Sequence, residues 1–150
     1  MHSSRATVEK GVEQLNSLLR GEISAVETYQ MAIEKVGGDR ATEGGQLRAV
    51  AQEHGENAQR LRDHIRRIGG EADDSSGAWG AWSKVVQGTM DLFGDASALK
   101  ALKEGEEHGL KDYREALDDV DAQSRQFIWE YMIPAQQRHV ATLNGMIERL

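Results

Sequence analysis

Cysteine is absent from this 150-residue sequence, and proline occurs only once. The absence of cysteine excludes disulfide bonds, thiolate metal ligands and cysteine nucleophiles. The scarcity of proline, together with abundant Ala, Leu, Glu, Gln, Lys and Arg, favours helices, because these residues have high helix propensities. The alternation of apolar and polar residues that is typical of strands is also missing. We therefore expect an all-α fold, in a single domain over residues 1–150 that is long enough to bury its own core.

Positive charge is outnumbered, with 18 Lys and Arg against 25 Asp and Glu and a net charge of −7. This balance argues against general binding to nucleic acids or to anionic membranes. No run of about 18 apolar residues occurs, and Met1–Glu13 lacks the apolar core of a signal peptide. We therefore expect a cytoplasmic protein with no nucleic-acid or membrane partner, and we interpret the arginines clustered in residues 60–67 as a solvated helix face.

Apolar residues recur at spacings of three and four in four long segments, at residues 8–36, 47–68, 99–120 and 128–150. This spacing predicts four amphipathic helices. The glycine pairs Gly37-Gly38 and Gly69-Gly70 are expected to end the first two. Pro134 lies inside the fourth segment and should kink that helix, since proline removes one backbone hydrogen bond. Because the first and last connections are short, the helices should form two antiparallel hairpins.

Residues 70–94 form a long connection between the two hairpins. A connection of this length can run along a bundle and return the chain beside its partners. It carries a short amphipathic stretch with Trp79 and Trp82. We interpret this stretch as a crossover helix that covers an open seam. The alternative is a ligand or homo-oligomer surface, because two neighbouring tryptophans would make an apolar patch if exposed.

One helical phrase occurs twice, as LLRGEISAVETY at residues 18–29 and as LKEGEEHGLKDY at residues 102–113. Each copy has Gly-Glu, then a small residue three positions after the Glu and a tyrosine seven positions after it. The matching residues are Glu22, Ala25 and Tyr29 in the first copy and Glu106, Gly109 and Tyr113 in the second. We interpret the tyrosines as core residues whose hydroxyls find a polar partner.

An ionisable residue interrupts the apolar seam near the middle of each segment: Glu22, His54, Glu106 and His139. Burying such a group costs several kcal/mol unless it is paired or neutralised. At about 1.5 Å per helical residue, the four positions lie at comparable heights along the bundle. The sequence therefore predicts that the four side chains converge on one interior point.

The repeat extends to the second helix of each half, where His54 and Asn57 correspond to Gln136 and His139. Each half thus offers one Glu from its first helix and two polar residues spaced i, i+3 from its second. This pattern resembles a ferritin-like four-helix bundle, whose di-iron members use one Glu from each of two helices and Glu-x-x-His from each of the others. The first phrase is similar to the first helix of rubrerythrins, and the whole chain resembles a small bacterial ferritin-like family of unknown function.

The resemblance implies a metal site built from Glu22, His54, Glu106 and His139, with Asn57 and Gln136 as weaker or outer partners. Both bridging carboxylates of the di-iron pattern are missing here. Two glutamates balance one divalent ion rather than two, so we expect one iron, zinc or manganese ion and disfavour di-iron oxidase chemistry. Glu53 could restore a ligand only if its helix rotated, and Glu56 should point away.

Two alternatives remain open at this point. The glutamates and histidines could form a metal-free buried network in a non-enzymatic bundle that acts through self-association or a protein partner. The family resemblance suggests stress survival as such a role. A storage cage would need an assembling surface, which one sequence does not reveal. Signatures of enzymes such as a phosphate-binding Gly-rich loop or a nucleophile elbow are absent from the sequence, so nothing in it identifies an enzyme.

Overall fold

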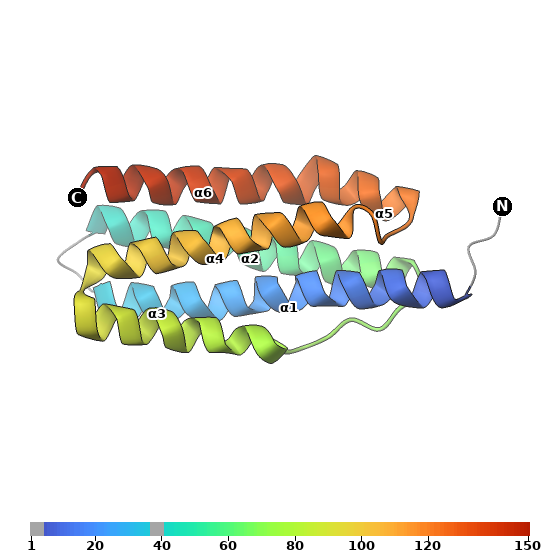
Figure 1. Ribbon diagram of the computed structural model, residues 1–150, viewed down its shortest axis with the longest axis horizontal. Helices are drawn as coiled ribbons and strands as arrows, with labels where there is room; N and C mark the ends of the chain where they lie inside the picture. Colours follow the sequence, from blue (N-terminus) through green and yellow to red (C-terminus); the bar gives the residue numbers. More distant parts are fainter. Residues whose placement is uncertain (1–4, 37–40) are drawn as a thin grey trace.

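The computed structural model describes residues 5–36 and 41–150, and these fold into a bundle of long helices (Figure 1). The long helices are α1 (Arg5–Val36), α2 (Ala41–Arg67), α4 (Asp95–Ala116) and a fourth stretch composed of α5 (Ala122–Phe127), a π-helical turn η3 (Ile128–Met132) and α6 (Ile133–Glu148). The described residues contain no strand, so the predicted all-α class is confirmed. None of these helices is both long and apolar enough to cross a membrane.

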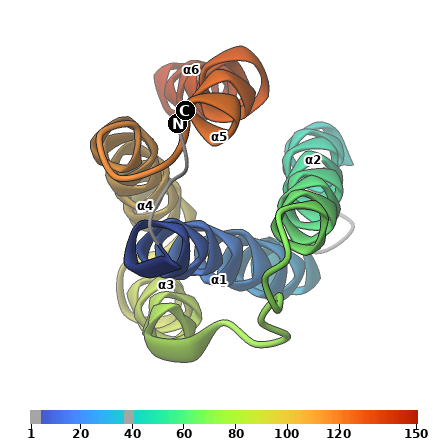
Figure 2. The ribbon, with the colours of Figure 1, turned by 90° about the vertical axis from the view of Figure 1, so that its right-hand side faces the viewer.

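The helices pair as two antiparallel hairpins, α1 with α2 and α4 with α6 (Figures 1 and 2). The predicted end of the second helix is confirmed. Gly69 adopts a left-handed φ of 88°, and the amide of Gly70 donates to the carbonyl of Ile65, as is common where glycine ends a helix. The other predicted stop, Gly37-Gly38, lies outside the described residues.

The irregularity expected at Pro134 takes the form of the π-helical turn that precedes it. The amide of Ile133 donates to the carbonyl of Ile128, five residues earlier, instead of four. A π turn adds one residue to the helix and so turns the following side chains by about 100° relative to an uninterrupted helix. Gln136 and His139 follow this turn, which therefore helps to set the direction in which they point.

The core consists of two apolar clusters on either side of a polar layer, which contains the buried side chains of Glu22, His54, Glu106 and His139. One cluster is centred on Leu19, Leu61 and Ile128, and the other on Ala32, Leu102 and Leu143. Burial of this kind contributes roughly 25 cal/mol for each Å² of apolar surface removed from water. The two clusters thus supply stability that can offset the cost of the polar groups between them.

His64 is a further polar residue of α2 that the core encloses. Its side chain is buried, with Nε2 2.7 Å from the hydroxyl oxygen of Ser124 and its ring stacked on Phe127. The short helix α5 supplies both partners and covers this part of α2. Val8, the first apolar residue of the segment predicted at residues 8–36, is by contrast exposed.

The crossover segment contains a 3-10 turn η2 (Gly77–Trp79) and helix α3 (Gly80–Phe93), which lies against α1 and α4 (Figure 2). The ring of Trp82 rests on Gly105, where an added Cβ would collide with it, and the ring of Trp79 lies beside Gly21. Gly105 thus leaves room for Trp82, whereas a Cβ on Gly21 would make only an ordinary contact with Trp79. The segment covers the α1–α4 face, as the sequence suggested.

Candidate metal centre

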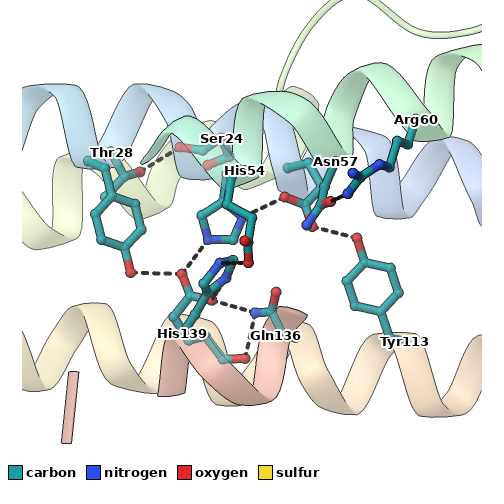
Figure 3. Close-up of polar contacts among 12 residues, drawn as sticks. Ser24, Thr28, His54, Asn57, Arg60, Tyr113, Gln136 and His139 are labelled. Carbon is teal, nitrogen blue, oxygen red and sulfur yellow. Dashed lines mark hydrogen bonds and ion pairs between the residues drawn. The ribbon is translucent and has the colours of Figure 1, made fainter. Parts of the chain in front are cut away.

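The four ionisable residues of the apolar seam meet in the polar layer. Glu22 comes from α1, His54 from α2, Glu106 from α4 and His139 from α6, and each of the four is at most 3% exposed. Figure 3 shows the rings of His54 and His139 approaching each other from opposite sides of the layer, and their centroids are 4.3 Å apart. The fold therefore brings these side chains to one interior point.

His54 links the two glutamates of the repeated phrase. Its Nδ1 lies 2.5 Å from Oε2 of Glu22, and its Nε2 lies 2.6 Å from Oε1 of Glu106. Burial alone would lower the pKa of His54, but the negative charges of Glu106 and Glu22, and the hydrogen bonds to both, hold that pKa well above its ordinary value. In the metal-free protein His54 is therefore held as an imidazolium that donates from both nitrogens to the two carboxylates.

Each tyrosine of the repeat donates a hydrogen bond to the glutamate of the other half. The hydroxyl of Tyr29 donates to Oε1 of Glu106 over 2.7 Å, and that of Tyr113 donates to Oε1 of Glu22 over 2.5 Å. Burial, followed by the neighbouring carboxylates, raises the pKa of both tyrosines well above the ordinary value. Both hydroxyls therefore stay protonated, and each has the polar partner that the sequence interpretation expected.

Glu106 is the residue shared by the most partners in the layer. Besides His54 and Tyr29, its Oε2 accepts a 2.5 Å hydrogen bond from Nε2 of Gln136, which also donates to the Glu106 carbonyl. A Cβ on Gly109 would lie 2.8 Å from this amide nitrogen, which explains the small residue in the second copy of the phrase. Burial alone would raise the pKa of Glu106, but His54 and His139 hold it well below its usual range.

Asn57, the other residue expected near the site, is buried on α2. Its side-chain oxygen accepts a 3.0 Å hydrogen bond from the guanidinium of Arg60, one turn further along the helix. In the repeat, Asn57 takes the place that His139 has in the second half. The structure thus sets an amide and a nearby cation where the other half has an imidazole.

His139 differs from the other members of the layer because neither of its buried ring nitrogens makes a hydrogen bond. Nδ1 lies 3.5 Å from Oε2 of Glu106, and Nε2 lies 2.8 Å from Oε1 of Glu53, but neither contact has hydrogen-bonding geometry. Glu53 is about one-third exposed and is also paired with Arg138. From the sequence, Glu53 is predicted to lie about 100° around α2 from His54, away from the apolar seam. The contact shows that this flank of α2 still reaches the edge of the layer.

Donor atoms of His54, Glu106 and His139 lie within 4.8 Å of one another. Imidazole nitrogen and carboxylate oxygen are ligands that zinc, iron and manganese accept. Buried polar atoms without partners are costly, and the unpartnered nitrogens of His139 would gain one by ligating an ion. These residues fit a divalent metal ion. Glu22 is outside this group of three, because its oxygens face His54 and Tyr113.

A cavity of about 30 Å³ lies beside the layer on the side of the crossover. Its lining includes the carboxylates Glu22 and Glu106 and the tryptophans Trp79 and Trp82. A cavity of this size has room for a water molecule next to polar groups. Water-sized molecules can therefore be accommodated next to the carboxylates, beneath the tryptophans.

Comparison with solved structures identifies the fold as ferritin-like. A ferritin-like, diiron-carboxylate protein from Bacillus anthracis matches with a TM-score of 0.77 and 19% identity, over 97% of this chain and 99% of that chain. A Rhodobacter capsulatus bacterioferritin, solved with a metal-free dinuclear site and haem iron, matches with a TM-score of 0.70 and 23% identity, over 99% of this chain and 87% of that chain. The predicted ferritin-like four-helix bundle is confirmed.

Family comparison agrees with the resemblance found in the sequence. Among curated proteins, none matches. A family model described as a domain of unknown function, DUF2383, matches residues 10–119, a range that includes Glu22, His54 and Glu106 and ends before His139. Since this match covers most of the chain, the protein belongs to the DUF2383 family, within the ferritin-like fold.

Proposed function

We propose that this protein binds one divalent metal ion per chain, through His54, Glu106 and His139. The observation that carries the proposal is the convergence of three buried donors from three helices, one of which, His139, has no hydrogen-bond partner for either ring nitrogen. A divalent ion would supply the missing partner and charge compensation for Glu106. Iron, zinc and manganese all accept this ligand set.

In this proposal the metal ion replaces the proton on Nε2 of His54, the nitrogen that faces Glu106, while Glu22 keeps the ring in place through Nδ1. The sequence pattern counts Glu22 among the ligands. Its carboxylate, however, is engaged by the imidazole of His54 through one oxygen and by the hydroxyl of Tyr113 through the other. A ligating histidine commonly directs its second nitrogen to a carboxylate, which fixes the orientation of the ring. Gln136 acts in the same way on Glu106, through a hydrogen bond to Oε2.

A single ion fits this chain better than a pair. A second ion beside Glu22 would need a ligand at position 57, where the chain has an asparagine hydrogen-bonded to the cationic Arg60. An amide is a weak ligand, and a nearby guanidinium disfavours a further cation. This supports a metal-binding protein without the two-metal chemistry of di-iron oxidases.

The test is the metal content of protein purified without a histidine tag, followed by titration with Co²⁺, whose visible absorption reports nitrogen and oxygen ligation. We expect one Co²⁺ per chain, competed off by Zn²⁺. A control variant, His108→Ala, removes an exposed histidine outside the layer and should bind equally. Failure of the wild-type protein to bind Co²⁺ or Zn²⁺ at neutral pH would overturn the proposal.

A metal-free polar network is the second candidate function of these residues, and the bonding of His54 favours it. Both nitrogens of His54 face a carboxylate at 2.5–2.6 Å, so an imidazolium already compensates much of the charge of Glu22 and Glu106. In this case the layer fixes the packing of the four helices, and the protein acts through a partner or through self-association. Absence of bound metal, together with full stability of the metal-free protein, would favour this candidate.

The remaining sequence predictions accompany both candidates. Self-association through the crossover segment that carries Trp79 and Trp82 stays a prediction, and the exposed apolar residues Val85, Leu92 and Phe93 of α3 support it. The solution mass from light scattering tests this prediction, and a large assembly would point instead to a storage cage. A cytoplasmic location and a role in stress survival also stay predictions.

A further inference from the structure

Among the described residues, Glu53 is the carboxylate other than Glu22 and Glu106 that contacts a side chain of the polar layer. It directly precedes His54 on α2, its side chain is 30% exposed, and its Oε1 lies 2.8 Å from Nε2 of the buried His139. The same oxygen lies 3.1 Å from a guanidinium nitrogen of Arg138, which is mostly exposed. Glu53 therefore connects the interior of the bundle with its surface, between α2 and α6.

The surroundings of His139 repeat those of His54. One nitrogen of each ring faces Glu106, at 2.6 Å for His54 and 3.5 Å for His139. The other nitrogen faces a second carboxylate, Glu22 in the case of His54 and Glu53 in the case of His139. The difference is that the contacts of His54 are formed hydrogen bonds, whereas those of His139 lack the required angle.

We propose that Glu53 is a positioning residue for His139. It accepts the N–H of Nε2, so that Nδ1 is left unprotonated and directed toward the ion beside Glu106. This inference rests on the proposed metal binding. The structure has Nε2 of His139 and Oε1 of Glu53 at hydrogen-bonding distance, 2.8 Å apart. Arg138 pairs with Glu53 at the edge of the polar layer, so two residues that are not buried fix the position of a buried ligand.

The physical consequence is a dependence of metal affinity on a residue that does not touch the ion. A neutral imidazole has two tautomers, and only the form protonated on Nε2 presents Nδ1 to the ion. Loss of an outer carboxylate of this kind lowers metal affinity by about 10- to 100-fold. Because Glu53 is partly exposed, its removal should leave the metal-free fold intact, which separates positioning from folding.

The first experiment compares Co²⁺ affinity in the wild type, Glu53→Ala, Glu53→Gln and Glu56→Ala. Glu56 is the matched control, since it lies three residues further on the same helix and is exposed. Glu53→Ala should lose about 10- to 100-fold in affinity. Glu53→Gln keeps an oxygen acceptor without the charge and should lose only about 3- to 10-fold, because hydrogen bonds to a neutral acceptor are weaker. Glu56→Ala should bind like the wild type.

The second experiment reads the tautomer of His139 directly, by long-range ¹H–¹⁵N NMR of the Zn²⁺-loaded protein. The wild type and Glu53→Gln should show a protonated Nε2 and a zinc-bound Nδ1, and Glu53→Ala should lose this single signature. If the wild type binds Co²⁺ and Glu53→Ala binds it equally well with the same tautomer, the role of Glu53 is refuted while metal binding stands. Equal losses in Glu53→Ala and Glu56→Ala would reduce the effect to net charge and also refute it. A wild type that binds no Co²⁺ would instead overturn the proposed function on which this role depends.

Discussion

The two halves of the bundle share one sequence phrase but use it differently. In the α1–α2 half, both oxygens of Glu22 already accept hydrogen bonds, from His54 and Tyr113, so this half is closed to a metal ion. Asn57 in the same half accepts a hydrogen bond from Arg60. In the α4–α6 half, Glu106 collects several donors, yet His139 beside it is left without a hydrogen bond. The repeated residues thus hold a carboxylate in each half, and the positions that are not repeated decide whether that half is saturated or open to a ligand.

This difference follows from where each half has its histidine. In the first half the histidine is the first member of the i, i+3 pair and bonds to the glutamate of its own half. In the second half an amide, Gln136, takes that place, and the histidine is the second member. The sequence repeat alone therefore does not imply two equivalent metal sites.

Removing the central carboxylate should have the largest effect on metal binding. Glu106→Gln should weaken Co²⁺ binding by more than the roughly 10- to 100-fold expected for loss of an outer partner, whereas Glu22→Gln should stay within that range. The reason is that Glu106 touches both histidines and Glu22 only one. Titration of both variants under the same conditions checks this order. Equal losses would show that Glu22 ligates the ion as well, and that the halves are alike.

Stability of the metal-free protein should reveal the pairing in the closed half. Glu22→Ala removes the acceptor of His54 and Tyr113 and should cost on the order of 1–3 kcal/mol. Glu22→Leu combined with His54→Leu removes both charged partners and should cost less than the two single changes added together. Urea unfolding of the wild type, the two single leucine variants and the double variant measures this coupling. A double mutant less stable than the sum of the singles would argue against a paired Glu22–His54 unit.

The pH dependence of stability should differ on the two sides of neutrality. The folded-state pKa of His54 is raised, so its contribution is complete below its unfolded pKa of about 6.5 and is lost as the pH rises through the folded value. The pKa of Glu106 is lowered, so its contribution is present above an unfolded pKa of about 4.3 and is lost in acid. The metal-free wild type should therefore lose stability above neutral pH more steeply than His54→Gln. Thermal melts between pH 6 and 9 with parallel slopes would count against an imidazolium at position 54.

The smallest effects should come from the tyrosines, where the two halves are most alike. Tyr29→Phe and Tyr113→Phe each remove one hydrogen bond to a buried carboxylate and should each destabilise the metal-free protein by about 1–2 kcal/mol. Chemical denaturation measures both values. A loss confined to one tyrosine would mean that the two tyrosine–glutamate hydrogen bonds are less alike than their distances of 2.5 and 2.7 Å indicate.

The sequence predicted the parts of this molecule that periodic burial determines. The helices, the crossover and the meeting of Glu22, His54, Glu106 and His139 follow from apolar spacing and from the cost of burying a charge. The contact between Glu53 and His139 was not predicted, because it depends on the rotation of α2 and on the π turn before α6, which spacing does not specify. The contact of His64 with Ser124 was not predicted either, because it depends on α5, whose six residues are too few for a helical period to be recognised.

The number of ions bound per chain tests most directly whether only one half of the bundle is open to a metal ion. Native mass spectrometry of Zn²⁺-reconstituted protein at neutral pH measures this number, alongside a His139→Ala control. The account predicts one zinc ion per chain in the wild type and none in His139→Ala. Two ions per chain would mean that the half containing Glu22 is also open, and no ion in the wild type would leave a purely polar network, so either result would contradict the account.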